Sequence, residues 1–76
     1  MPHVIVKMYA GRTETQKFQL AEVITRAVMA GTECTRNAVS VSVEDVPPAK
    51  WVDAVYTPDI AGKADTLYKK PGYSPG

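Results

Sequence analysis

The alternation of apolar and polar residues near the start of the chain predicts a β-strand. In the stretch 4–9, Val4, Val6 and Met8 lie on one face and are all apolar, which is the period of a strand with one buried side. The segment Ala10-Gly11-Arg12 then breaks this pattern. The first strand is therefore expected to end near Tyr9.

A long helix is predicted to follow. Thr13-Glu14-Thr15-Gln16 has the form of a capping box, in which Thr13 caps the amide of Gln16 and the Gln16 side chain reaches back. The apolar residues beyond it recur at steps of three and four, as on one face of a helix: Leu20, Ala21, Val23, Ile24, Ala27 and Val28. This helix is expected to end near Gly31.

A second strand is predicted over 38–46, where Val39, Val41 and Val43 share one face. A strand, a helix of about five turns and a second strand form a βαβ unit, in which the two strands run parallel. The expected fold class is α+β, with the valine face against the helix. An isolated two-stranded sheet is marginal, so we expect dimerisation to complete it.

The C-terminal part is expected to be helical. Pro47-Pro48 stops the second strand, and the spacing of apolar residues over 49–55 suits a short helical turn. Thr57-Pro58-Asp59 then resembles a helix start, with Thr as the N-cap and Pro as the first helical residue. The predicted apolar stripe of this second helix is Ile60, Ala64, Leu67 and Tyr68, and Pro71-Gly72 is its expected end.

Composition narrows the function classes. The 76 residues fit a single domain, 1–76, with a net charge of +1 and 45% hydrophobic residues, so neither a disordered chain nor a nucleic-acid-binding surface is expected. Cys34 is the single cysteine, which favours a reducing cytoplasm. No run reaches the roughly 18 apolar residues of a membrane span. Without a phosphate loop or a Cys/His cluster, no metal or cofactor is expected.

Pro2 is the first candidate for chemistry. Directly behind the initiator Met1, it becomes a free secondary amine if Met1 is removed, and aminopeptidases accept a small second residue. The reference pKa of an α-amino group is near 8, so such an amine can be tuned to act as a base at neutral pH. The structural alternative is a proline that merely starts a strand.

Pro2 before a strand, followed by Gly11-Arg12 and by Gln16-Lys17 at the start of a helix, resembles the 4-oxalocrotonate tautomerase family. The ending Lys69-Lys70-Pro71-Gly72-Tyr73-Ser74 is similar to that of the dimeric PptA-like tautomerases of this family. The resemblance implies a cofactor-independent keto–enol tautomerase that works as a homodimer. It also agrees with the βαβ unit read from the residue pattern.

The resemblance assigns roles to four residues. It makes Pro2 the general base and Arg12 the ligand of a substrate carboxylate, and it places Trp51 where an aromatic residue keeps the proline's pocket apolar. Ser40 stands where a second substrate-binding arginine occurs. Because that cation is missing, a monoacid such as an aryl enolpyruvate is expected in place of a diacid. Arg12, Ser40 or a backbone N–H is left to stabilise the developing enolate.

Two alternatives remain at this stage. Some relatives hydrate or dehalogenate unsaturated acids with a carboxylate that activates water, and Asp53 lies near the expected position of that group. In that case Pro2 acts as an acid. If Met1 is retained, the Pro2 nitrogen is a tertiary amide without useful basicity, and the chain is a non-catalytic dimeric module.

Overall fold

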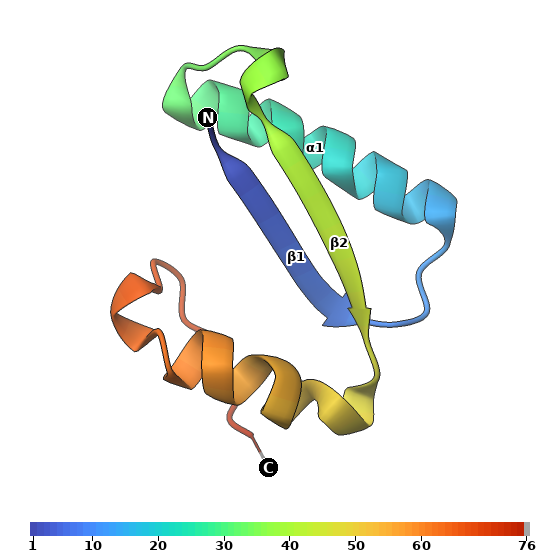
Figure 1. The fold of residues 1–76 in the computed structure, drawn as a ribbon, viewed down its shortest axis with the longest axis vertical. Coiled ribbons are helices and arrows are strands. Elements are labelled where there is room, and N and C mark those ends of the chain that lie inside the picture. The colour runs from blue at the N-terminus through green and yellow to red at the C-terminus, as the bar shows by residue number, and fades with distance from the viewer. Residues whose placement is uncertain (76) are drawn as a thin grey trace.

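The chain folds as a βαβ unit with an irregular helical extension (Figure 1). A computed structural model describes residues 1–75. Strands β1, His3–Tyr9, and β2, Ser40–Val46, pair in parallel, and helix α1, Glu14–Thr32, connects them. The register places His3 beside Ser40 and Tyr9 beside Val46. The predicted strand, helix and strand are thus confirmed.

Local side-chain bonds define the start of α1. The amide of Gln16 donates to Thr13 Oγ1 over 3.1 Å, and the amide of Thr13 donates to Gln16 Oε1 over 2.9 Å. This is the predicted capping box, which satisfies two amides that a helix start leaves unpaired. The helix ends at Glu33, whose left-handed backbone (φ 55°) stops it about two residues beyond the predicted Gly31.

Helix α1 covers one face of the sheet. Phe18 and Ala21 share a hollow with Val41 and Val43, so the valine face lies against the helix as predicted. Lys17 ties the start of α1 to the end of β2 through an ion pair with Asp45 at 3.0 Å. The helix and the strand ends therefore hold each other in place.

The C-terminal extension differs from its prediction. The short helical turns η1, Arg36–Ala38, and η2, Pro48–Lys50, flank β2, and the wide helix η3, Val52–Ala61, follows. Thr57 and Pro58, expected to begin a helix, lie inside η3. Beyond it the only helical segment in the described chain is η4, Ala64–Thr66, so the helix predicted up to Pro71 is wrong in both its start and its length.

The wide turn of η3 explains why Pro58 is tolerated. Its hydrogen bonds span five residues, as in the bond from the Gly62 amide to the Thr57 carbonyl at 2.8 Å. A β-carbon on Gly62 would lie 2.8 Å from the carbonyl oxygen of Pro58, so the chain leaves η3 through a turn that only glycine fits. Contacts with the sheet fix η3 in place, because Val55 is buried and Asp59 pairs with Lys7 of β1.

The core of a single chain is small. Of residues 1–75, only Val46 and Val55 are buried hydrophobic residues, while Ile5 is 54%, Phe18 75% and Val23 61% exposed. The sheet has two strands, so each strand has one unpaired edge. A chain this short buries little of its apolar surface alone. The open sheet and the exposed apolar residues therefore leave surface for association with another chain.

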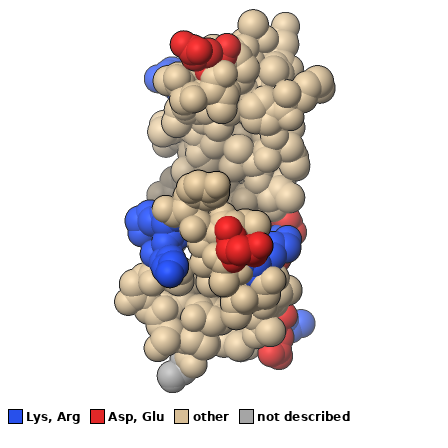
Figure 2. Space-filling view, turned by 90° about the vertical axis from the view of Figure 1, so that its left-hand side faces the viewer, with Lys and Arg blue, Asp and Glu red and all other residues tan. Residues whose placement is uncertain are grey.

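The surface carries few charges on the side shown in Figure 2. Uncharged residues cover most of this face, and its Lys and Arg side chains form no continuous stripe. None of the helices among residues 1–75 combines the length and the apolar character that crossing a membrane demands.

Candidate active site

A hollow of about 450 Å³ opens at the C-terminal end of β1. Strand β1, the loop after it, the start of η3 and the C-terminal tail supply its lining, which consists of Lys7, Met8, Tyr9, Arg12, Trp51 and Tyr73. Arg12, and Lys7 in its ion pair with Asp59, thus lie among aromatic rings. Such a surface suits a ligand with an anionic group and an apolar or aromatic body.

Arg12 contributes to this hollow a guanidinium that has no ion-pair partner within residues 1–75. The preceding Gly11 has a φ of 128°, a conformation that L side chains rarely adopt, and it turns the chain from β1 toward α1. Within residues 1–75, the exposed Arg12 guanidinium forms no ion pair or side-chain hydrogen bond, so its donors are available. A guanidinium in this state is suited to binding a carboxylate with two parallel bonds.

Aromatic contacts fix the wall of the hollow. Trp51 meets Tyr9 edge to face, with ring centroids 5.2 Å apart and ring planes at 85°. On its other side, Trp51 Nε1 donates to the hydroxyl oxygen of Tyr73 over 3.0 Å. The Tyr73 ring also lies 5.9 Å from that of Tyr56. The indole is therefore held between a strand residue and a tail residue.

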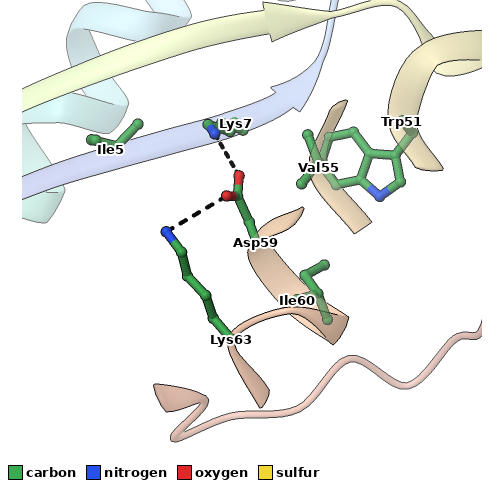
Figure 3. A pocket seen from close by; sticks show the side chains of 7 residues that line it. All are labelled: Ile5, Lys7, Trp51, Val55, Asp59, Ile60 and Lys63. Carbon is green, nitrogen blue, oxygen red and sulfur yellow. Dashed lines mark hydrogen bonds and ion pairs between the residues drawn. The ribbon is translucent and has the colours of Figure 1, made fainter. Parts of the chain in front are cut away.

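A second hollow of about 360 Å³ adjoins the first, and Lys7 and Trp51 line both (Figure 3). Figure 3 shows Lys7 and Lys63 converging on the Asp59 carboxylate, with Lys63 at 3.7 Å. The hydrogen bond with Lys7 lowers the pKa of Asp59, and the same bond raises the pKa of Lys7. Asp59 thus partly neutralises the charge of Lys7 beside the Arg12 hollow.

Pro2 lies at the opposite end of the sheet. The Ser40 amide donates to the Pro2 carbonyl over 3.2 Å, and His3 Nδ1 lies 2.6 Å from Ser40 Oγ. Pro2 is partly exposed, and Met1 before it is fully exposed. Ser40 therefore anchors the residue that carries the candidate amine.

The structure brings the predicted site residues together in two pairs. Arg12 and Trp51 share the larger hollow, whereas Pro2 and Ser40 are neighbours at the start of the strands. β1 has seven residues, and at roughly 3.3 Å per residue it holds its ends about 20 Å apart. Asp53, the candidate for the hydratase alternative, is exposed and lines neither hollow.

Comparison with known proteins identifies the family. A family model described as "Tautomerase enzyme" matches residues 2–55. The chain belongs to the tautomerase family. The resemblance read from its residues is thereby confirmed, and as a tautomerase the protein is an isomerase.

Similar proteins cover nearly the whole chain of this tautomerase. A "Probable tautomerase" of Xylella fastidiosa is 44% identical over 73 residues, covering 96% of this chain and 89% of the relative. "Tautomerase PptA" of Klebsiella pneumoniae is 40% identical over 75 residues, covering 97% and 99%. "Tautomerase PptA" of Cronobacter sakazakii is 34% identical over 74 residues, covering 96% and 97%.

The residue pattern of this tautomerase did not reveal Lys7 or Tyr9 as lining residues. Lys7 and Tyr9 read from the sequence as the outer face of a strand. They reach the hollow because η3 and the tail fold back beneath β1 (Figure 1). Within residues 1–75, no three His, Cys, Asp or Glu side chains are arranged to hold a metal ion.

Proposed function

We propose that this tautomerase interconverts the enol and keto forms of a small 2-hydroxy-enoic acid resembling an aryl enolpyruvate. Residues 1–76 act as one domain of a cytoplasmic homodimer that uses no cofactor. The observation that carries the proposal is Arg12, an unpaired guanidinium in a hollow with aromatic walls. Arg12 binds the substrate carboxylate, and Trp51 contacts the apolar or aromatic part of the substrate.

Pro2 is the base in this proposal, after Met1 has been removed. Its secondary amine takes the proton of the enol hydroxyl, and the electron pair of that O–H bond stays on oxygen as an enolate. As this pair forms the second bond of the carbonyl, the electron pair of the carbon–carbon double bond takes the proton from the Pro2 ammonium, which forms the new C–H bond and returns the amine to its neutral form. Positive charge on Arg12 and apolar walls both disfavour the ammonium, so they lower the pKa of the Pro2 amine toward neutrality.

The separation of Pro2 from Arg12 requires a second chain. In the two-fold dimer that we propose, antiparallel β1 strands pair in the register centred on Val6, so that His3 of one chain faces Tyr9 of the other. Pro2 then stands opposite Ala10 of the partner subunit, next to that chain's hollow. Each site is thus built from the amine of one chain and the Arg12 hollow of the other.

Pairing through the free edge of β2 does not assemble this site. It would place the two β1 strands on the outside of a four-stranded sheet, and each Pro2 would remain about one strand length from any Arg12. The β1 edge is therefore the dimer interface that we propose. It also pairs the backbone edge that β1 leaves open in the single chain.

Ser40 supports a monoacid as the substrate. Its hydroxyl is bonded to His3 and its amide to Pro2, so position 40 itself supplies no guanidinium for a second carboxylate. The position lacks a charge-assisted contact that is worth roughly 1.5–3 kcal/mol. The Ser40 amide has the separate task of fixing the Pro2 backbone.

The test is the ketonisation rate of phenylenolpyruvate, followed by the loss of enol absorbance. Intact mass first establishes that Met1 is absent from the natural protein. Pro2→Ala should lower kcat/KM by roughly 10²- to 10⁴-fold, because it removes the secondary amine from the position of the base. Pro48→Ala, an exposed proline at the start of η2, is the matched control and should retain the rate. Equal rates for wild type and Pro2→Ala would overturn the proposal.

A further inference from the structure

We infer that Tyr73, in the C-terminal tail, is a positioning residue that gives this enzyme its preference for aryl substrates by holding the Trp51 indole in place. The inference rests on the proposed function and deepens it, because it assigns the source of the selectivity. It also gives the tail after η4 a role at the site.

The contacts of Tyr73 support this role. Its hydroxyl oxygen accepts the Trp51 Nε1–H bond at 3.0 Å, and its ring lies beside Tyr56 at 5.9 Å. Tyr73 is 49% exposed and lines the same hollow as Arg12. Tyr56 thus steadies the ring while the hydroxyl reaches the indole, and the tail becomes part of the wall.

The hydrogen bond from Trp51 to Tyr73 adds a second contact that holds the Trp51 side chain in place. Tyr9 meets the indole edge to face, and this contact alone leaves the indole free to tilt about its two side-chain torsions. The bond from Nε1 to Tyr73 fixes a second point of the ring. A ring fixed at two points presents one defined surface, which favours a flat aryl group over a flexible alkyl chain because less freedom is lost on binding.

The hydroxyl of Tyr73 also satisfies the only hydrogen-bond donor of the indole. When an aryl group covers Trp51, water loses access to that N–H, and an unpaired donor would weaken binding. The Tyr73 hydroxyl therefore increases the affinity for an aryl ligand more than that for a small alkyl ligand, which leaves the indole N–H accessible to water. The expected signature is a loss of selectivity and not a general loss of activity.

The experiment uses the fact that Trp51 is the only tryptophan of the chain. Its fluorescence reports binding of 3-phenylpropionate, a non-reacting aryl monoacid, and of hexanoate, a monoacid without a ring. Tyr73→Phe should weaken phenylpropionate binding by about three- to tenfold and hexanoate binding by less than about twofold, as the loss of one hydrogen bond allows. Tyr68→Phe, the same change at a fully exposed tyrosine, should leave both unchanged.

Turnover and a double mutant supply two further readouts. With phenylenolpyruvate, Tyr73→Phe should raise KM and leave kcat nearly unchanged. In a Trp51→Phe background, measured by calorimetry, Tyr73→Phe should have no further effect, because the N–H that it serves is gone.

Three results would overturn the inference: equal losses for phenylpropionate and hexanoate, no loss for either, or a full loss that persists in Trp51→Phe. Because phenylpropionate binding needs no turnover, its outcome is separate from that of the proposed reaction. A protein that binds both acids as expected but ketonises no enol would contradict only the reaction.

Discussion

Pro2 and Arg12 lie beyond opposite ends of β1, with the whole strand between them. One carries the candidate base and the other the candidate carboxylate ligand, and a single chain cannot bring them to one substrate. In the proposed dimer each site takes one of them from each chain. Under this proposal the stability and the activity of the enzyme depend on the same association.

Mixing two impaired variants, assayed at a substrate concentration well below KM, should restore activity. Pro2→Ala and Arg12→Ala homodimers each lack one half of every site. A heterodimer of the two chains has one complete site and one site that lacks both residues. Random exchange should recover about a quarter of the wild-type rate.

The control is each variant mixed with itself, which should stay at the low rate of that variant. If both residues acted within one chain, no mixture would recover any activity. Activity should be measured after unfolding and refolding the two variants together, so that their chains exchange.

Loss of Arg12 should mainly weaken substrate binding. Arg12→Ala removes a charge-assisted contact worth roughly 1.5–3 kcal/mol, so kcat/KM for an aryl enolpyruvate should fall by about 10- to 100-fold, largely through KM. Arg12→Lys should recover only part of it, since an ammonium lacks the planar fork of a guanidinium. An unchanged KM in Arg12→Ala would contradict the proposed role.

Ser40→Arg should shift preference toward diacids. The substitution adds a cation at the end of the sheet that carries Pro2, where Ser40 now bonds His3. We expect the ratio of kcat/KM for an enol diacid over a monoacid to rise by about tenfold, as one further ion pair with the substrate allows. Ser40→Gln, a long but neutral side chain, is the control for size and should leave the ratio unchanged.

Thermal stability should depend on protein concentration. The buried hydrophobic core of one chain comprises Val46 and Val55 within residues 1–75, so folding is expected to be coupled to dimerisation. A tenfold dilution should lower Tm by a few degrees, because association contributes about 1.4 kcal/mol less. Calorimetry over a concentration series measures this. A Tm independent of concentration would contradict a dimer-dependent fold.

Glu22 should make stability sensitive to acid. Bonds from Arg36 and Arg26 lower its pKa from 4.5 to about 2. A carboxylate whose pKa is lowered by folding stabilises the protein above the pKa of the unfolded chain, and this contribution is lost as the pH falls toward the folded value. Wild type should therefore exceed Glu22→Gln in stability at pH 6, and the gap should close between about pH 4.5 and 2. Glu33→Gln, an exposed site, serves as control.

Local signals predicted the βαβ unit well because the patterns that define each of its elements are close in sequence. Thr13 and Gln16 cap α1 within one turn, and strand alternation sets which valines face the helix. The C-terminal helix was predicted wrongly because its start is decided at a distance. Lys7, 52 residues away, binds Asp59, and burial of Val55 favours helical structure from Val52 onward. Thr57 and Pro58 therefore lie in the interior of η3 and do not begin a helix.

The site was predictable only in part. Sequence resemblance selected Pro2, Arg12, Trp51 and Ser40, and their roles stay predictions until the variants are measured. The structure adds how these residues are placed. Trp51 and Arg12 line the same hollow, and Ser40 is hydrogen-bonded to Pro2. No periodicity foretells that the tail passes Trp51, since Tyr73 is 22 residues beyond it and outside any helix or strand.

The exposed Met1 makes catalysis a matter of processing as well as folding. Under the proposed mechanism a chain that keeps Met1 still folds and still pairs, because the Pro2 carbonyl and not its nitrogen bonds Ser40. Such a chain contributes its Arg12 hollow to the site that it shares with the partner's Pro2, but it supplies no amine to the other site of the dimer. The activity of a mixed population should thus rise in direct proportion to the fraction of chains that have lost Met1, so the amount of active enzyme is set after translation.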